Sequence, residues 1–404
     1  MTRTLFRGAL VFDGTGATPA PADVVVEDGR FVDIGTGLDG DESLDCTGKA
    51  LLPGLFDCHV HLMFSGLDVL RMLQTPFSYP FYEAIHNLRA TLDRGITTVR
   101  DAGGADLGVQ QAQRNGLIAG PRMQISLGMI SQTGGHGDDW MPCGAGVPLL
   151  MAHPGRPSTI VDGPEEMRRK VRELIRNGAD VIKVATSGGV LSPRSDPRRG
   201  HFRDEEIAVL VEEATAAGRF VMAHAQAADG IKVAIRNGVR SIEHGIYLDD
   251  EAIEMMLAAG TWLVPTLSAP RAVLDAVDAG ITLPTHMIDK ARMVIETHTG
   301  SVRTAIEAGV TVAMGTDSGV GPHGDNLREL VLMSECGMTA AQALQATTLS
   351  AARLLGVDGE YGSIDVGKRA DLVLVDGDPL DLATLPGRIE RVYADGRLVV
   401  EPRS

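Results

Sequence analysis

The chain has 404 residues, of which 44% are hydrophobic and 22% charged, and its formal net charge is −16. These proportions are ordinary for a globular protein, and the length suits a barrel of about 250 residues with a smaller appendage. A charge this negative argues against nucleic-acid or anionic-membrane partners, which would need a basic surface.

The four cysteines are scattered and show no C-x-x-C spacing: Cys46, Cys58, Cys143 and Cys336. Scattered cysteines favour free thiols in a reducing compartment. The first residues contain no apolar stretch of signal-peptide length, and no apolar run reaches the length of a membrane span. We therefore expect a cytoplasmic protein without a membrane partner.

Both ends of the chain are predicted to form short β-strands. Apolar runs bounded by turn residues occupy residues 9–12, 23–27, 30–34, 370–375, 389–393 and 397–400. Asp28-Gly29 is a hairpin signal, because glycine adopts the positive φ angles of tight turns. Neither terminal piece is long enough to bury a good core by itself. We expect residues 1–54 and 358–404 to form one small β-sandwich domain.

Residues 55–357 alternate between apolar strands and amphipathic helices. Eight strands are predicted, at residues 51–57, 97–100, 123–127, 181–184, 220–223, 241–243, 262–265 and 311–314. Most follow a helical pattern that ends in glycine, the usual residue just beyond a helix. Eight strands separated by helices favour an α/β fold, a (β/α)8 TIM barrel inserted into the small domain. An open doubly wound sheet is disfavoured, because no G-x-G-x-x-G motif follows the first strand.

The helical pattern is less regular over residues 267–290, which contain Pro270, Pro284 and His286. Proline interrupts helices, because it lacks a backbone N–H group. We predict a long loop and a helix over the mouth of the barrel, where they would form a lid.

Two histidines follow the first barrel strand. His59 and His61 are one residue apart and come directly after the apolar run Leu51-Leu-Pro-Gly-Leu-Phe56. Residues i and i+2 of a strand project from the same face, about 6–7 Å apart. Two neutral imidazoles that point into one cavity suit a divalent transition metal. Alone, His-x-His is a weak signal, and a pair of unrelated histidines explains it equally well.

Further metal-binding side chains occur where later strands end. Side chains at the C-terminal ends of barrel strands line one shared pocket. The candidates at these positions are His59, His61, Lys183, His224, His244 and Asp317. Together they make a binuclear ligand set, provided that Lys183 becomes anionic.

Lys183 becomes anionic if it carries a carbamate. An ammonium group beside two dications is disfavoured by like charge and by burial, whereas a buried lysine loses its proton readily. A neutral amine that captures carbon dioxide becomes a carbamate, an oxygen ligand able to bridge two metals. The alternative is a structural lysine paired with a carboxylate, and the strand-end histidines favour the carbamate over it.

These motifs resemble the metal-dependent amidohydrolase superfamily, in particular the branch related to imidazolonepropionase and to Xaa-Pro or Xaa-Arg dipeptidases. The matching stretches are Leu52-Pro-Gly-Leu-Phe-Asp-Cys-His-Val-His61, Val181-Ile-Lys-Val184, Gly188-Gly-Val-Leu-Ser-Pro193, Ala223-His-Ala225, Ile242-Glu-His-Gly245, Gly315-Thr-Asp317 and Gly367-Lys-Arg-Ala-Asp-Leu-Val-Leu-Val375. They follow the family's order and span nearly the whole chain.

The resemblance implies a site with two divalent ions, and zinc is the metal expected for such ligands. One ion would be held by His59, His61, Lys183 and Asp317, and the other by Lys183, His224 and His244. A water shared by two metals loses a proton near neutral pH. Asp317 would take that proton and pass it to the leaving amine. The predicted catalytic residues are Asp317, Lys183 and His244.

Four more residues are candidates for binding substrate: His136, His323, Tyr247 and Gln226. His136 follows the third strand and His323 the eighth, so both leave the active face of the barrel. Gln226 stands two residues after His224, where some dipeptidases of this branch carry tyrosine. An amide can still donate a hydrogen bond there, but a phenol cannot be assumed. For His323 and Tyr247, a place away from the substrate is at least as plausible.

The sequence thus predicts a metal-dependent hydrolase that cleaves an amide bond in a dipeptide or an N-acyl amino acid. A cyclic amide hydrolase is the nearest alternative, and a deaminase is a weaker one. A barrel whose metal is only structural is a third, disfavoured because structural zinc is closed by four protein ligands. The partner is a small-molecule substrate, and the resemblance implies a homo-oligomer.

Overall fold

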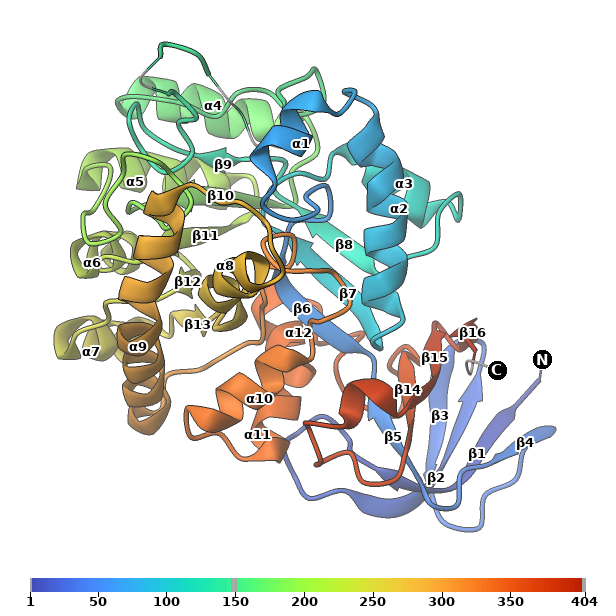
Figure 1. Cartoon of the computed structure of the whole chain (residues 1–404). Helices are drawn as coiled ribbons and strands as arrows, with labels where there is room; N and C mark the ends of the chain where they lie inside the picture. The colour runs from blue at the N-terminus through green and yellow to red at the C-terminus, as the bar shows by residue number, and fades with distance from the viewer. Residues whose placement is uncertain (1, 142, 147, 149–150, 402–404) are drawn as a thin grey trace.

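The computed structural model describes residues 2–141, 143–146, 148 and 151–401. Strands from the two ends of the chain, blue and red in Figure 1, lie together at one end of the molecule. The central part of the chain forms the larger body beside them. Among the described residues, no helix is both long and apolar enough to cross a membrane.

The smaller body is built around one sheet with the strand order β16-β15-β14-β5-β1-β2-β3, and β4 also pairs with β1. Its strands are β1 (Thr4–Val11), β2 (Ala20–Glu27), β3 (Arg30–Gly35), β4 (Glu42–Asp45), β5 (Lys49–Pro53), β14 (Leu372–Asp376), β15 (Ile389–Ala394) and β16 (Arg397–Val400). The two ends of the chain meet where β5 and β14 pair antiparallel, with Leu51 opposite Leu374. Phe6, Phe31, Leu372 and Tyr393 share one buried core there, which explains how two short pieces fold together.

Parallel strands form two sheets in the larger body, ordered β6-β7-β8 and β13-β12-β11-β10-β9. These strands are β6 (Leu55–Val60), β7 (Ile96–Asp101), β8 (Arg122–Ile125), β9 (Met129–Ile130), β10 (Val181–Ala185), β11 (Phe220–Ala225), β12 (Ser241–His244) and β13 (Trp262–Val264). Strands β6, β7 and β10 are buried along their whole length. Because both faces of these strands are buried, the strands form the interior of the larger body.

Helices surround these strands: α1 (Val69–Gln74), α2 (Tyr79–Leu92), α3 (Leu107–Arg114), α4 (Pro164–Arg176), α5 (Asp204–Ala216), α6 (Ala228–Arg236), α7 (Asp250–Ala259), α8 (Ser268–Asp278), α9 (Thr285–Ala308), α10 (Arg328–Glu335), α11 (Ala340–Ala346) and α12 (Leu349–Leu355). Helix α7 shows the expected signals, because the Asp249 side chain caps its first turn and Gly260 ends it at φ 66°.

The strand predicted at residues 51–57 is in fact two strands in different sheets. β5 ends at Pro53 and β6 begins at Leu55. The chain passes closest to its neighbours at Gly54, where an added Cβ would lie 2.3 Å from Thr97 Oγ1. Because Pro53 has no N–H group and Gly54 no side chain, the polypeptide leaves one sheet and enters the other here.

The strand predicted at residues 311–314 is not a regular strand. The segment instead bonds to strands on both sides: Leu263 N donates to Thr311 O at 2.9 Å, and Cys58 N donates to Met314 O at 2.9 Å. It thus runs between β13 and β6, the strands at the ends of the two parallel sheets. Beyond it, Asp317 has φ 60°, outside the extended region, so the segment does not continue as a strand.

The segment predicted as a lid consists of α8, a short connection and the start of the 24-residue helix α9. The prediction of a long loop was wrong for residues 268–278, which form α8 with Pro270 in its first turn, where proline is tolerated. Ala269, Pro270, Val273, Pro284 and Met287 line the same cavity as the predicted metal ligands.

Candidate active site

A cavity of about 670 Å³ lies at the C-terminal ends of the parallel strands. Its wall includes all six predicted metal ligands, His59, His61, Lys183, His224, His244 and Asp317. His136 and Gln226 line the same cavity. The side chains come from β6, β10, β11, β12 and the segment before Ser318. Parallel strands therefore bring together residues that are as many as 258 positions apart in the sequence.

His59, near the end of β6, and His61, one residue beyond that strand, both face Asp317. Asp317 Oδ1 lies 3.0 Å from His61 Nε2 and 3.5 Å from His59 Nε2. One ligand atom each of His59, His244 and Asp317 lie within 4.8 Å of one another. Atoms this close can share one cation.

Each of the four histidines uses one ring nitrogen to contact an acceptor outside the group. His59 Nδ1 lies 2.7 Å from Glu243 Oε2, and His61 Nδ1 lies 2.7 Å from the Gly103 carbonyl. His224 Nε2 lies 3.0 Å from the Gly188 carbonyl. A carboxylate or a carbonyl can only accept, so these nitrogens carry the proton. Each ring therefore keeps a lone pair on its other nitrogen.

His244 also donates from one ring nitrogen, and its acceptor is a hydroxyl group. Its Nδ1 lies 2.6 Å from Thr266 Oγ1, whose own proton goes to the Pro265 carbonyl at 2.7 Å. The hydroxyl thus accepts from His244, and Nε2 stays free as a ligand atom. His224 would bind through Nδ1, whereas the other three would bind through Nε2.

Two of the candidate ligands have strained backbones. His244 has φ 73° and Asp317 φ 60°, and Thr266, the partner of His244, has φ 52°. A non-glycine residue at positive φ costs about 1 kcal/mol or more and persists only where surrounding contacts hold it. Such outliers gather at functional sites.

A buried ion pair that sequence reasoning did not identify supports His59. Glu243 Oε1 accepts from Arg100 Nη2 at 2.9 Å and from Ser241 Oγ at 2.5 Å. Both charged side chains are at least 97% buried. The sequence contained a signal for the role of Glu243, because this residue is a carboxylate inside an apolar strand and directly precedes the predicted ligand His244.

Burial also sets the protonation of the histidines. It lowers the pKa of His59, His224 and His244 well below the usual value, and the positive charge of Lys183 lowers the pKa of each further. Neutral imidazoles are the form that binds metals. Burial would raise the pKa of Asp317, but the neighbouring His59, His61 and Lys183 outweigh it and hold that pKa below its usual range.

Lys183 is a buried amine without a partner. Its side chain is 1% exposed, and Nζ has no hydrogen-bond partner among the described residues. Burial lowers the pKa of Lys183 to about 8, although the charges of Glu243 and Asp317 oppose the shift. An unpaired ammonium group in such a place is costly, so the neutral amine is accessible near neutral pH.

His136 and Gln226 lie where they could contact a substrate. The His136 ring stacks on His224, with ring centroids 4.1 Å apart, and its Nδ1 lies 2.9 Å from Ser192 Oγ. Burial lowers the pKa of His136 to about 3, so its ring is neutral. Gln226 Oε1 is buried and has no hydrogen-bond partner in the part of the chain that the structure describes.

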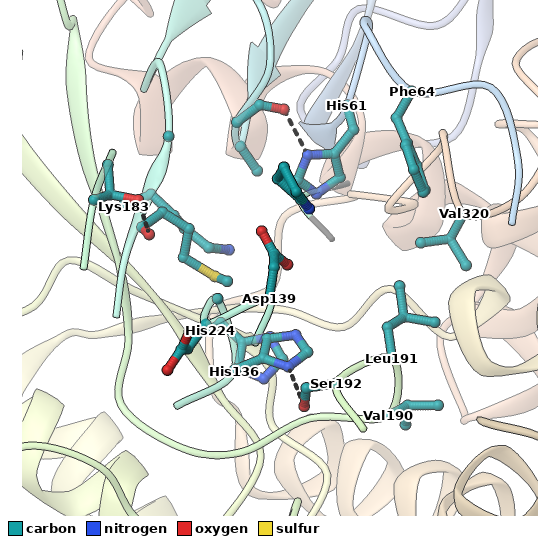
Figure 2. Close-up of a pocket in the computed structure, with 18 of the residues that line it drawn as sticks. His61, Phe64, His136, Asp139, Lys183, Val190, Leu191, Ser192, His224 and Val320 are labelled. Carbon is teal, nitrogen blue, oxygen red and sulfur yellow. Dashed lines mark hydrogen bonds between the residues drawn. The ribbon is translucent and has the colours of Figure 1, made fainter. Parts of the chain in front are cut away.

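The other two substrate candidates are not at the cavity wall. His323 Nε2 bonds to the Phe64 carbonyl at 3.0 Å, behind the cavity. Tyr247 packs beneath α9 with Ile246 and Val294. Asp139, which sequence reasoning missed, points its carboxylate into the cavity between Lys183 and His61 (Figure 2). The opposite side is apolar, formed by Phe64, Val190, Leu191 and Val320 (Figure 2).

Comparison with known proteins agrees with this site. The family model described as the amidohydrolase family matches residues 50–399. Ochratoxinase from Aspergillus niger is 33% identical over 423 aligned positions, covering 99% of this chain and 87% of that protein. Imidazolonepropionase from Geobacillus sp. (strain WCH70) is 25% identical and covers 87% and 83%. The crystal structure of a Xaa-Pro dipeptidase with bound methionine in the active site superposes with a TM-score of 0.89, at 34% identity and 98% and 99% coverage.

The chain is therefore a hydrolase with an α/β fold that contains a TIM barrel. It belongs to the amidohydrolase family, in the branch that includes imidazolonepropionase and the Xaa-Pro dipeptidases, and it acts on amide bonds. The resemblance read from its motifs is thereby confirmed.

Proposed function

We propose that the protein is a binuclear metal-dependent hydrolase that cleaves the amide bond of a dipeptide or an N-acyl amino acid. The observation that carries the proposal is the gathering of six ligand-type side chains around one cavity with the amine of Lys183 unpaired among them. A lone structural site would not need a buried amine without a partner, nor a cavity of about 670 Å³ beside it.

The residues present fit two divalent cations, most plausibly zinc. His59, His61 and Asp317 would hold one, and His224 and His244 the other. The free lone pairs of the four rings and the proximity of His59, His244 and Asp317 support this assignment. Carbamylation of Lys183 would convert its side chain into an anion and supply oxygen ligands for the two ions.

Once bound, such ions would polarise the scissile carbonyl and supply hydroxide at neutral pH. Side chains of the protein transfer the proton and bind the substrate. The Asp317 carboxylate takes a proton as the nucleophile adds, and it returns that proton to the amine that leaves. The neutral ring of His136 and the side chain of Gln226 orient the carbonyl. The apolar side of the cavity, with Phe64 and Leu191, holds an apolar side chain of the substrate.

The relatives support this substrate class. The solved relative compared above is a Xaa-Pro dipeptidase that holds an amino acid, methionine, in its active site. A cyclic amide is the second candidate, supported by the resemblance to imidazolonepropionase. We further propose closure of the parallel strands into a (β/α)8 barrel over 55–357, a β-sandwich domain from 1–54 and 358–404, a cytoplasmic location and a homo-oligomer.

The proposal is tested by assaying zinc-loaded protein against a panel of dipeptides, N-acetyl amino acids and cyclic amides, with metal content measured in parallel. We expect about two metal ions per chain, and chelation that abolishes hydrolysis while the circular dichroism spectrum is kept. Asp317→Asn removes activity, whereas Asp39→Asn, at an exposed turn, is the matched control. Hydrolysis of cyclic amides alone, ammonia as the product, or activity that survives chelation would each overturn it.

A further inference from the structure

Arg156 is a buried cation in the wall of the same cavity. Its side chain is 6% exposed and lines the cavity together with His61 and Asp317. Nη1 donates to the Gly104 carbonyl, and Nη2 donates to the Met151 carbonyl at 2.8 Å. Nε is buried without a hydrogen-bond partner among the residues that the structure describes. Within the same residues no ion pair includes this guanidinium group, so its hydrogen-bond partners are neutral carbonyls.

A rigid hairpin holds Arg156 in place. The backbones of His153 and Arg156 exchange two hydrogen bonds of 2.9 Å. The His153 ring packs against Phe77 and Phe81, with centroids 5.6 Å and 5.8 Å away. The guanidinium group is therefore positioned before any ligand binds, which reduces the entropy cost of binding.

One turn connects Arg156 to the metal-ligand group. The Gly103 carbonyl accepts from His61, and the carbonyl of the next residue, Gly104, accepts from Arg156. The Asp101 carboxylate accepts from the N–H groups of Gly103 and Ala105 and so fixes this turn. The guanidinium group thus lies on the His61 side of the cavity.

The negative charges of Asp101 and Asp106 act on Arg156 without forming an ion pair with it, and both carboxylates accept hydrogen bonds from backbone N–H groups. Asp101 accepts three backbone N–H groups, from Leu62, Gly103 and Ala105. Asp106 caps α3 through the N–H of Val109. A buried guanidinium group that donates only to carbonyls and forms no ion pair is costly. Its planar fork matches a carboxylate in two parallel hydrogen bonds, so an anionic ligand would remove that cost.

We propose that Arg156 binds the free carboxylate of the substrate, so that the enzyme selects amides whose amine portion is an amino acid with an unblocked C-terminus. This inference rests on the proposed function. It adds to that function the side chain that distinguishes a substrate with a free carboxylate from the corresponding carboxamide.

The test uses the zinc-loaded enzyme and pairs of Ala-Xaa dipeptides and Ala-Xaa carboxamides. We expect wild type to favour the free acid in kcat/KM by about 30-fold or more. Arg156→Met should lower kcat/KM for the acid by a similar factor, mainly through KM, and leave the carboxamide unchanged. Arg156→Lys should restore part of the preference. Arg194→Met is the matched control, because Arg194 is exposed and lies over Trp140, 5.9 Å from its ring centroid.

Equal rates for acid and carboxamide in wild type would overturn the inference while the proposed function stands, as would an equal loss of both rates in Arg156→Met. If wild type hydrolyses neither, the proposed function fails, and calorimetry with free amino acids and their carboxamides still tests Arg156. If Arg156→Met does not fold, product inhibition of wild type decides: inhibition by the free amino acid only supports the role, and equal inhibition by its carboxamide refutes it.

Discussion

Glu243 and His59 face each other across the buried interior of the larger body, with Oε2 and Nδ1 2.7 Å apart. They come from β12 and β6, which belong to different sheets. The same carboxylate holds Arg100, whose Nε also donates to the Cys58 carbonyl at 2.7 Å. One ion pair thus fixes both the ring of His59 and the backbone just before it.

Replacing this carboxylate should weaken metal binding more than it weakens the fold. In Glu243→Gln the His59 ring loses a charged acceptor, and we expect metal affinity to fall about 10- to 100-fold. Competition with a chromogenic chelator measures the affinity. Glu254→Gln, at an exposed position of α7, is the control. Unchanged affinity in Glu243→Gln would mean that the carboxylate serves only Arg100.

Lys183→Ala should remove the bridging ligand but leave the imidazoles in place. We expect activity to fall by about 100-fold or more, because both catalytic ions lose a ligand. Added short-chain carboxylic acids should restore part of it by filling the vacated space with a carboxylate. If the amine itself were the active group, primary amines would restore activity and carboxylic acids would not. Metal content with and without the acid separates these outcomes.

The stability of the metal-free protein should fall as the pH drops from about 6.5 to 4. Burial lowers the pKa of His298 to about 4 and that of His323 to about 4. The unfolded chain therefore binds these protons first, below its pKa of about 6.5. Each such histidine contributes stability that is complete above pH 6.5 and is lost at about 1.4 kcal/mol per pH unit below it. Urea unfolding across this range gives the slope, and His298→Gln should make it shallower. A slope that stays the same in this variant contradicts the assignment to His298.

Lys290 connects the predicted lid to the loop that supports two site histidines. Its Nζ donates to the carbonyls of Gly189 at 3.1 Å and Ser192 at 2.7 Å, and also to that of Ser195. In the same loop, Gly188 accepts from His224 and Ser192 contacts His136.

Lys290→Met should therefore increase hydrogen exchange of the amides in residues 188–195 and lower kcat by about 10-fold. Lys290→Arg, which keeps the donors, should retain most of the activity. Faster exchange that is spread evenly over the whole protein would point to general destabilisation instead.

The sequence alone predicted the family and the ligand-type side chains of this protein. His59 and His61 are one residue apart, and strand periodicity directs both rings into one space. Glycines after helices marked most of the strand starts, and His224 and His244 stand at the ends of such strands. The family and the class of fold follow from that pattern, because it depends on local backbone geometry.

Tertiary structure decided what local patterns cannot encode. The partner of His59 is Glu243, 184 positions away, and one partner of Arg156 is the Gly104 carbonyl, 52 positions away. The strand expected over residues 51–57 was divided by a close approach to Thr97, and His323 was turned behind the cavity wall. Each of these features depends on which segments of the chain pack together. The burial of whole faces of strands and helices decides that packing, and the neighbouring residues in the sequence do not.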